Sequence, residues 1–278
     1  MIHETPAGKG VVYPVVSRRS SGLSLGVNLF PQAKACNFDC PYCEVPPGIS
    51  GPAFSLDALA SELEAFFNKE YPSAWPSYSL KDICFSGNGE PTLSPYLFPA
   101  LELCAQSRRS YPEIAGKSAL VLITNATGFG DPWIRKGLGE FAEREGLSVW
   151  AKLDSGGQAL YSAMNRSSLA FEEVLEGLRI FSRLVPVTIQ TMVCSLNGRA
   201  PSSQDAIDLA VALSGLLDSG CRIHGLQVYT LARPPLEAWA GGISDADIKE
   251  YIGIVASVLG GRLPVQGYGA SGLGPLTL

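Results

Sequence analysis

The chain has 278 residues, of which 46% are hydrophobic, and a formal net charge of -5. This length allows a sizeable core in one large α/β domain or two small ones. The acidic balance excludes a global attraction to nucleic acid or anionic membranes, so such binding would need a local basic patch. The first residues do not resemble a signal peptide, and no apolar run reaches the roughly 20 residues of a membrane span. We therefore expect a cytoplasmic protein without a membrane partner.

Runs of β-branched and aromatic residues alternate with segments of helical periodicity along the chain. The runs that predict strands begin at Ser24, Asp82, Ala119, Ser148, Val187 and His224. The predicted helices begin near Ser55, Ser94, Asp131, Ala170, Ser203 and Ser244. Ser55 is a favourable N-cap, Pro132 suits a first helical turn, and Asp245 supports a start after Ser244.

This strict alternation of six strand–helix units implies a parallel sheet with right-handed crossovers. Six units are too few for a closed barrel of about eight strands. We predict an α/β fold with an open, partial (β/α)6 barrel of parallel strands, and a flat doubly wound sheet is the alternative. We expect a single domain over residues 1–278, with its core at about 22–235, an N-terminal extension at 1–21, and a C-terminal helix and edge segment at 236–278.

Three of the seven cysteines, Cys36, Cys40 and Cys43, lie close together with the spacing CxxxCxxC. The odd count and this crowding indicate a reduced compartment and a metal site rather than a disulfide scaffold. Three thiolates on one loop can hold three irons of a [4Fe–4S] cluster, which leaves the fourth iron open to the amine and carboxylate of a small molecule. A cluster that only carries electrons would normally have a fourth cysteine ligand.

A zinc site would need a fourth ligand, and the sequence offers none in a suitable place. The chain has only two histidines, and each remaining cysteine lies in or beside a predicted strand or helix, where a small buried hydrophobic residue is expected. These cysteines are Cys84, Cys104, Cys194 and Cys221. Asn37, Asp39 and Pro41 are loop formers, which argues against a chance cluster of buried thiols.

CxxxCxxC after a first strand resembles the signature of the radical S-adenosylmethionine (SAM) superfamily. The resemblance implies that Cys36, Cys40 and Cys43 hold a [4Fe–4S] cluster, and that the loop backbone near Tyr42 contacts the adenine of SAM. It implies an enzyme of the iron–sulfur oxidoreductase or lyase type, which cleaves SAM reductively to a 5'-deoxyadenosyl radical that abstracts hydrogen from a substrate. Because the sequence shows no flavodoxin-like phosphate loop, we expect a separate low-potential electron donor of flavodoxin or ferredoxin type.

The second predicted strand ends in the turn GNGEP, which runs from Gly87 to Pro91. Glycines let the backbone approach a ligand, and Glu90 offers a carboxylate for an ammonium group. An ordinary glycine-rich turn is the alternative. Alongside the cysteine loop, the turn resembles the GGE motif of the superfamily, which implies that Gly87, Gly89 and Glu90 bind the methionine amine of SAM. Asn88, between the glycines, departs from that motif.

The third and fourth predicted strands also end in polar residues. Asn125 either contacts SAM or substrate, or caps a turn. Lys152 and Asp154 share one face of the fourth strand, where buried charges are costly unless they are paired or functional. They are therefore either a mutual ion pair or, as the resemblance implies, contacts to the ribose hydroxyls and the methionine carboxylate of SAM. Tyr229 is expected to be a core residue or a wall that stacks on adenine.

Further segments resemble a single-domain branch of this superfamily that is related to the tRNA wyosine-base synthases. They are SRRSSGLSLGVNLFPQAKACNFDCPYC, SGNGEPTL, KLDSG, MNR and VYTLARPP, within roughly residues 12–235. Arg18, Arg19, Arg166 and Arg233 thereby become candidates for substrate contacts. The branch implies tRNA base modification, while the acidic balance argues against it, so a small-molecule or peptide substrate is equally open.

The alternative from another class is a non-catalytic iron–sulfur or zinc-stabilised binding protein. It predicts a fourth protein ligand and no SAM site. The GNGEP turn and the pair Lys152 and Asp154 would then be coincidences.

Overall fold

The structure is a computed structural model that describes residues 10–272 and 274–276. The chain divides into two compact units that interleave along the sequence. The first unit comprises Met1–Cys36, Val45–Ile123 and Glu140–Ser148, and the second comprises Asn37–Glu44, Thr124–Gly139 and Val149–Leu278. The expected terminal segments fall partly outside the described residues, at 1–9, 273 and 277–278. The organisation as one domain stays a prediction.

The strands of the first unit follow the order β1-β2-β3-β4. They are β1 (Val12–Ser17), β2 (Gly22–Val27), β3 (Leu80–Phe85) and β4 (Ala119–Thr124), whose last residue belongs to the second unit. β1 is antiparallel to β2, whereas β2, β3 and β4 are parallel. The predicted strands at Ser24, Asp82 and Ala119 are thereby confirmed.

Strand β1 lies within the expected N-terminal extension and is not among the predicted strands. Pro14 weakens a strand assignment because proline has no amide hydrogen to donate. In the structure Pro14 lies opposite Leu25 on β1, which among the described residues pairs with β2 alone. An edge strand tolerates proline because one side of its backbone needs no partner strand.

The helices of the first unit are α1 (Leu56–Ala65), α2 (Tyr71–Ala74), α3 (Leu97–Ser110) and α4 (Pro112–Ala115), with a π-helical turn at Phe66–Glu70. Ser55 caps α1 as predicted, because its hydroxyl accepts a hydrogen bond from the Ala58 amide at 3.1 Å. α3 begins at Leu97 rather than near Ser94, since Pro91–Leu93 forms a separate 3₁₀ turn.

The strands of the second unit follow the order β5-β6-β8-β10 and are all parallel. They are β5 (Leu147–Lys152), which begins in the first unit, β6 (Val187–Met192), β8 (Ile223–Tyr229) and β10 (Val265–Tyr268). β10 lies within the expected C-terminal segment and pairs in parallel with β8. Two short strands, β7 (Ser195–Leu196) and β9 (Ala240–Gly241), pair separately and antiparallel.

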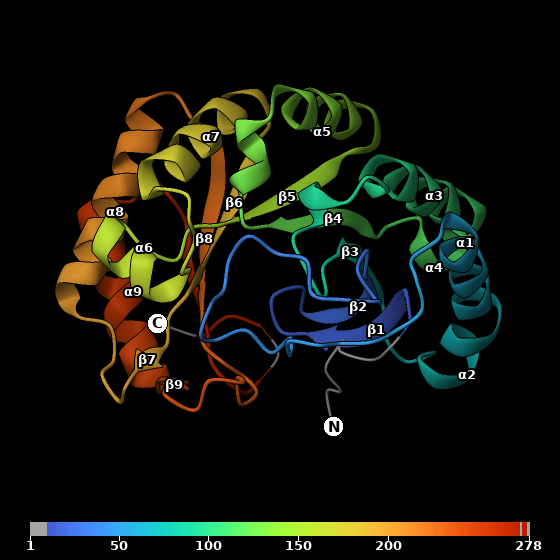
Figure 1. Ribbon diagram of the computed structural model, residues 1–278, viewed down its shortest axis with the longest axis horizontal. Coiled ribbons are helices and arrows are strands. Elements are labelled where there is room, and N and C mark those ends of the chain that lie inside the picture. The colour runs from blue at the N-terminus through green and yellow to red at the C-terminus, as the bar shows by residue number, and fades with distance from the viewer. Residues whose placement is uncertain (1–9, 273, 277–278) are drawn as a thin grey trace. The chain divides into compact units, whose positions relative to one another are not determined.

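The remaining helices are α5 (Pro132–Glu145), which crosses between the units, α6 (Gln158–Met164), α7 (Phe171–Leu184), α8 (Ser203–Asp218) and α9 (Asp245–Leu259). The starts of α5, α7, α8 and α9 confirm the predicted helix starts. The short helix α6 was not predicted. α8 and α9 begin with capping boxes at Ser202 and Ser244. Figure 1 shows α7, α8 and α9 alongside β6 and β8 in the second unit.

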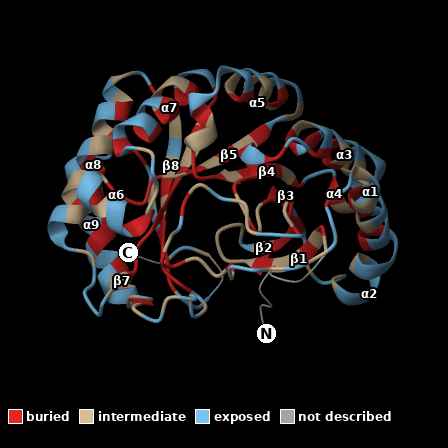
Figure 2. Cartoon of the chain, in the orientation of Figure 1, coloured by how far each residue is buried: buried red, intermediate tan, exposed pale blue. Residues whose placement is uncertain are grey.

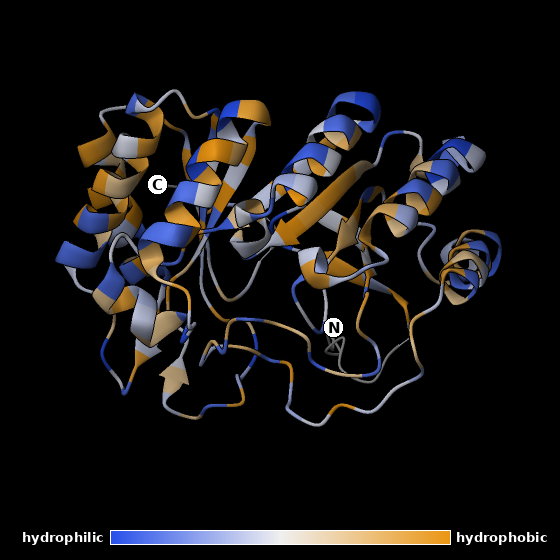
Figure 3. Ribbon diagram, turned by 45° about the horizontal axis from the view of Figure 1, so that its top comes forward, coloured by the Kyte–Doolittle hydropathy of each residue, from blue (hydrophilic) through white to orange (hydrophobic). Residues whose placement is uncertain are grey.

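Burial follows this arrangement. Figure 2 shows buried residues along the strands and on the inner faces of the helices, and Figure 3 shows hydrophilic residues on the outer helix faces. Within the described residues, no helix has the length and hydrophobicity that a membrane span requires. Because ligands of parallel α/β sheets bind beyond the carboxyl ends of the strands, the loops after β2 to β8 are where a functional site is expected.

Candidate functional site

In the first unit, the GNGEP turn after β3 lies beside the start of the cysteine loop. The Ala35 amide donates to the Asn88 carbonyl at 3.1 Å, and the Glu90 amide donates to the Ala35 carbonyl at 2.8 Å. Ala35 and Gly89 thus form a parallel bridge immediately before Cys36, whose side chain is exposed. The structure therefore joins two of the predicted motifs by backbone hydrogen bonds.

Both glycines of this turn are required by the local backbone. A Cβ atom on Gly89 would lie 2.1 Å from the Ala35 carbonyl oxygen and 2.6 Å from the Phe30 ring. Gly87 has a φ angle of 137°, a region that residues with side chains rarely adopt. The turn therefore has a structural reason for its glycines, and their contact with SAM stays a prediction.

Glu90 is buried, with 2% of its surface exposed. Its carboxylate accepts hydrogen bonds from the Thr92 amide at 3.0 Å and the Thr92 hydroxyl at 2.7 Å, so it caps the 3₁₀ turn. Beside it, Asn88 has a buried side-chain oxygen without a hydrogen-bond partner in the part of the chain that the structure describes. An amine ligand would suit such an acceptor, because an unsatisfied buried acceptor costs about 1–3 kcal/mol.

Substitution of Gly89 by alanine should destabilise the protein by about 1–3 kcal/mol, because the new methyl group would overlap the Ala35 carbonyl. The matched control is Gly215→Ala in α8, where a Cβ atom meets open space. It should stabilise the protein by up to about 1 kcal/mol, as alanine favours a helix interior. Urea unfolding followed by circular dichroism measures both effects. Equal stabilities of the two variants would contradict the close approach of the turn to Ala35.

In the second unit, Tyr42 of the cysteine loop meets Lys152 and Asp154 at the end of β5. The Tyr42 hydroxyl donates a hydrogen bond to the Asp154 carboxylate. The Lys152 ammonium lies 3.6 Å from that carboxylate and 4.5 Å from the centre of the Tyr42 ring. It also lies 3.1 Å from the hydroxyl of Tyr229, which ends β8. Three predicted site residues therefore form one buried network.

Asp154 is the centre of this network, and its side chain is 0% exposed. One carboxylate oxygen accepts the Met192 amide at 2.9 Å, and the other accepts the Asn165 side-chain amide at 3.0 Å in addition to Tyr42. The mutual ion pair weighed in the sequence analysis is thus present. Direct contact of Lys152 and Asp154 with SAM stays a prediction, and the internal partners of Asp154 give it a structural role in any case.

The network keeps Tyr42 neutral and Lys152 charged. Burial and the neighbouring Asp154 carboxylate raise the pKa of the Tyr42 hydroxyl well above its usual value. Burial alone would lower the pKa of Lys152, but the attraction of the Asp154 carboxylate outweighs it and the pKa is raised. A fixed positive charge therefore lies at the end of β5, with 16% of the Lys152 side chain exposed.

Cys40 and Cys43 belong to this second unit and are partly buried. Burial raises the pKa of the Cys40 thiol to about 11, whereas the positive charge of Lys152 and the hydrogen bond from Asn165 oppose that rise. The Asn165 side-chain nitrogen lies 3.7 Å from the Cys40 sulfur. Among the described residues, no three side chains of His, Cys, Asp or Glu gather as a metal site.

Three cysteines on one loop are nevertheless the residue type that iron–sulfur clusters use as ligands. Cys36, Cys40 and Cys43 belong to no disulfide bond, and none of them is fully buried. The four other cysteines are buried, which confirms the prediction that they are small hydrophobic residues. Burial raises the pKa of the Cys194 thiol to about 12, so this cysteine is a poor source of thiolate. The loop cysteines are therefore the accessible thiols of the chain.

Side chains after β4 hold the beginning of the loop within the second unit. The Asn125 carboxamide caps its own turn, because its oxygen accepts the Thr127 amide at 3.1 Å, and its nitrogen donates to the Asn37 side chain at 2.7 Å. Asn37 in turn donates to the Thr127 hydroxyl at 2.7 Å. The turn-capping role of Asn125 is confirmed, and contact with SAM or substrate stays a prediction.

Two of the candidate arginines also hold the loop. Arg166 donates to the Asp39 carbonyl and forms ion pairs with Asp39 at 3.0 Å and Glu237 at 2.8 Å. Arg233 forms an ion pair with Glu44 at 2.6 Å. Arg18 and Arg19 lie in the first unit, between β1 and β2. Substrate contacts of these arginines stay predictions, and no pattern in the sequence indicates their loop-holding contacts to Glu237 and Glu44.

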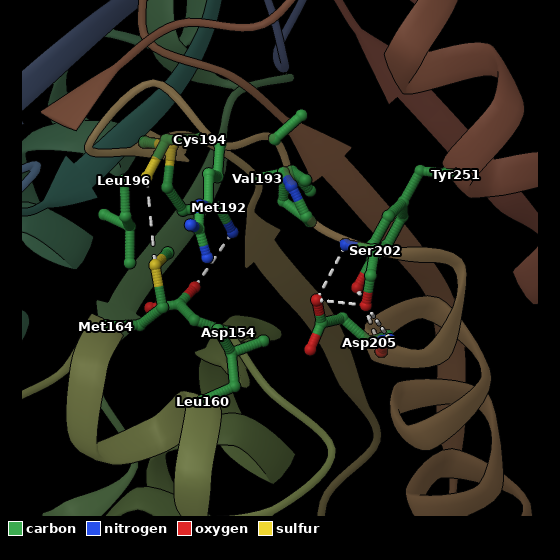
Figure 4. A pocket seen from close by; sticks show the side chains of 13 residues that line it. Asp154, Leu160, Met164, Met192, Val193, Cys194, Leu196, Ser202, Asp205 and Tyr251 are labelled. Atoms are coloured by element: carbon green, nitrogen blue, oxygen red, sulfur yellow. Dashed lines mark hydrogen bonds between the residues drawn. The ribbon is translucent and has the colours of Figure 1, made fainter.

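A cavity of about 270 Å³ lies beside Asp154 in the second unit. Figure 4 shows the side chains that line it, among them Met164, Met192 and Cys194. The Cys194 and Met164 sulfurs lie 3.8 Å apart and share a buried cluster with Tyr42 and Tyr229. The cavity thus adjoins the network beneath the cysteine loop.

Among solved structures, a radical SAM methyltransferase from Sphaerobacter thermophilus resembles this chain with a TM-score of 0.64. The match covers 89% of this chain and 66% of that chain at 16% sequence identity. This likeness shows the fold, which is a mostly parallel α/β partial barrel. The predicted fold class is thereby confirmed.

Among curated proteins, two UPF0026 proteins from different strains of Helicobacter pylori resemble the chain in sequence. One is 29% identical over 190 residues, which is 66% of this chain and 56% of that protein. The other is 28% identical over 223 residues, which is 80% of this chain and 66% of that protein. The chain thus spans less than two thirds of the length of these relatives. No protein-family model matches the chain, and the link to the wyosine-base synthases stays a hypothesis.

Proposed function

We propose that this chain is a radical SAM enzyme that holds a [4Fe–4S] cluster on Cys36, Cys40 and Cys43. The observation that carries the proposal is a CxxxCxxC loop on a fold that resembles a radical SAM methyltransferase. When bound, the cluster would supply one electron to the sulfonium of SAM, which breaks a carbon–sulfur bond and yields methionine and a 5'-deoxyadenosyl radical. The electron would come from a separate flavodoxin- or ferredoxin-type protein.

The cysteine loop would supply three thiolates and leave one iron without a protein ligand. Such an iron can accept the amine and carboxylate of a small molecule. The other cysteines are buried in the structure and are poorly suited to complete the set. This distribution favours an open cluster over the closed cluster of the alternative, non-catalytic binding protein.

The GNGEP turn would bind the methionine amine of SAM. Glu90 offers negative charge, and the side-chain oxygen of Asn88 is a buried acceptor that has no partner among the described residues. The absence of a side chain on Gly89 permits the close approach of the turn to Ala35, next to Cys36. An ammonium group would therefore meet acceptors beside the first cysteine.

Lys152 and Asp154 would play different roles at the end of β5. Lys152 keeps 16% of its side chain exposed and can offer its charge to the methionine carboxylate. Asp154 is 0% exposed and acts through its neighbours as a positioning residue, because it holds both Tyr42 and Lys152. Tyr42 would present the loop backbone to the adenine of SAM.

The substrate from which the radical abstracts hydrogen is unidentified. The resemblance to the wyosine-base branch supports tRNA base modification, whereas the net charge of -5 favours a small molecule or peptide. The cavity beside Asp154, lined by Met164 and Met192, is a candidate for an apolar part of that substrate.

Anaerobic reconstitution with iron and sulfide, followed by dithionite and SAM, tests the proposal. We expect a brown protein that releases 5'-deoxyadenosine, and no release when dithionite is omitted. Addition of tRNA, peptides and metabolites in turn should raise the release with the true substrate class. If the spectrum of the cluster does not change when SAM is added, the result would instead support the non-catalytic binding protein.

A further inference from the structure

Asn165 connects the cysteine loop to the buried network in the second unit. It follows α6, is 2% exposed, and belongs to the segment MNR, for which the sequence suggested a role only for Arg166. Its side-chain nitrogen lies 3.7 Å from the Cys40 sulfur and 3.0 Å from the Asp154 carboxylate. One side chain thus faces two electron-rich acceptors.

The orientation of this carboxamide is fixed by those acceptors. Its nitrogen carries two hydrogens, so it can donate to both at once. The reversed orientation would place the carboxamide oxygen against a carboxylate and a sulfur, which is unfavourable. Tyr42 has only one hydroxyl hydrogen, and it donates that to Asp154. Asn165 is therefore placed to donate its second hydrogen to the Cys40 sulfur.

The backbone holds Asn165 in this position. Its carbonyl accepts the Asp39 amide at 2.9 Å, and its amide donates to the Tyr161 carbonyl at 2.8 Å. Arg166, the next residue, has a φ angle of 46° and also binds Asp39. The donor is thus fixed to the residue that precedes Cys40, which gives the contact a defined geometry.

We propose that Asn165 donates a hydrogen bond to the Cys40 thiolate and thereby raises the reduction potential of the cluster. The inference rests on the proposed function. Reduction adds negative charge that the cysteine sulfurs share, so a donor to a sulfur stabilises the reduced state more than the oxidised one. Asn165 is accordingly a positioning residue that acts through Cys40.

The test measures the midpoint potential of the reconstituted full-length protein by a redox titration followed by electron paramagnetic resonance. Asn165→Leu is close in size but has no donor, so its cluster should have a more negative potential than the wild type. The matched control is Thr127→Val, which removes the hydrogen bond to Asn37 without touching a sulfur. It should leave the potential unchanged.

A second measurement needs no variant. Resonance Raman spectra of the wild-type cluster should show iron–thiolate bands that shift between water and heavy water, because the donated hydrogen exchanges. The shift should shrink in Asn165→Leu. If the iron–thiolate bands of the wild-type protein do not shift in heavy water, the inference is overturned, even if Asn165→Leu fails to fold.

The outcomes separate the two proposals. A wild-type protein that assembles no cluster would defeat the proposed function and this inference together. If the wild-type protein assembles a cluster and Asn165→Leu has the same midpoint potential, the inference fails while the proposed function stands. Equal shifts in Asn165→Leu and Thr127→Val would also defeat it, since they would reflect general loosening of the loop.

Discussion

Cys40→Ala should give a protein that stays colourless after anaerobic reconstitution and releases 5'-deoxyadenosine only at background level. The substitution leaves two loop thiolates, and the buried cysteines elsewhere are poor replacements. We expect SAM cleavage to fall by more than about 100-fold, because even partners outside the ligand set commonly cost about 10–100-fold in metal affinity or activity. Absorbance, bound iron and chromatography of the nucleoside product measure the effect.

The matched control is Cys104→Ala, which removes a fully buried thiol in α3. This substitution should cost stability on the order of 1 kcal/mol and leave both the brown colour and SAM cleavage in place. The ligand assignment would be refuted by a normal cluster in Cys40→Ala. Loss of the cluster in both variants would show that cysteine removal acts through folding.

Regular elements were predictable where local chemistry and the tertiary structure agree. Ser55 and Ser244 have the chemistry of N-caps, and both cap the helices expected after them. The parallel strands were predictable from their β-branched and aromatic residues, because such side chains pack well on a largely buried sheet. β1 is missed because Pro14 argues against a strand unless its edge position is known.

The candidate site was predictable only in part. Cysteine spacing and charges at a strand end are visible in sequence, which is why Cys40, Lys152 and Asp154 could be named. Asn165 could not, because its contact with Cys40 joins residues 125 positions apart. The same holds for Arg233 and Glu44, which are 189 positions apart. Side chains whose role depends on such partners carry no periodicity or spacing that identifies them.

Asp154→Ala should lower the free energy of unfolding by about 3–5 kcal/mol, the usual cost of removing one partner of a buried ion pair. The change would leave the Lys152 charge without its carboxylate, and it would take the acceptor from the Met192 amide and the Tyr42 hydroxyl. Urea unfolding of the cluster-free protein, followed by circular dichroism, measures the loss.

A double-mutant cycle with Lys152→Met determines how much of that loss comes from the unpaired charge. The double variant Asp154→Ala/Lys152→Met should lose clearly less stability than the two single losses combined, because it leaves no buried ammonium without a partner. If the double variant loses as much unfolding free energy as the two single variants combined, solvent screens the Lys152 charge despite its burial. The importance of Asp154 would then lie in the hydrogen bonds that it accepts from Tyr42 and Asn165, and Asp154→Asn would be expected to retain only part of them.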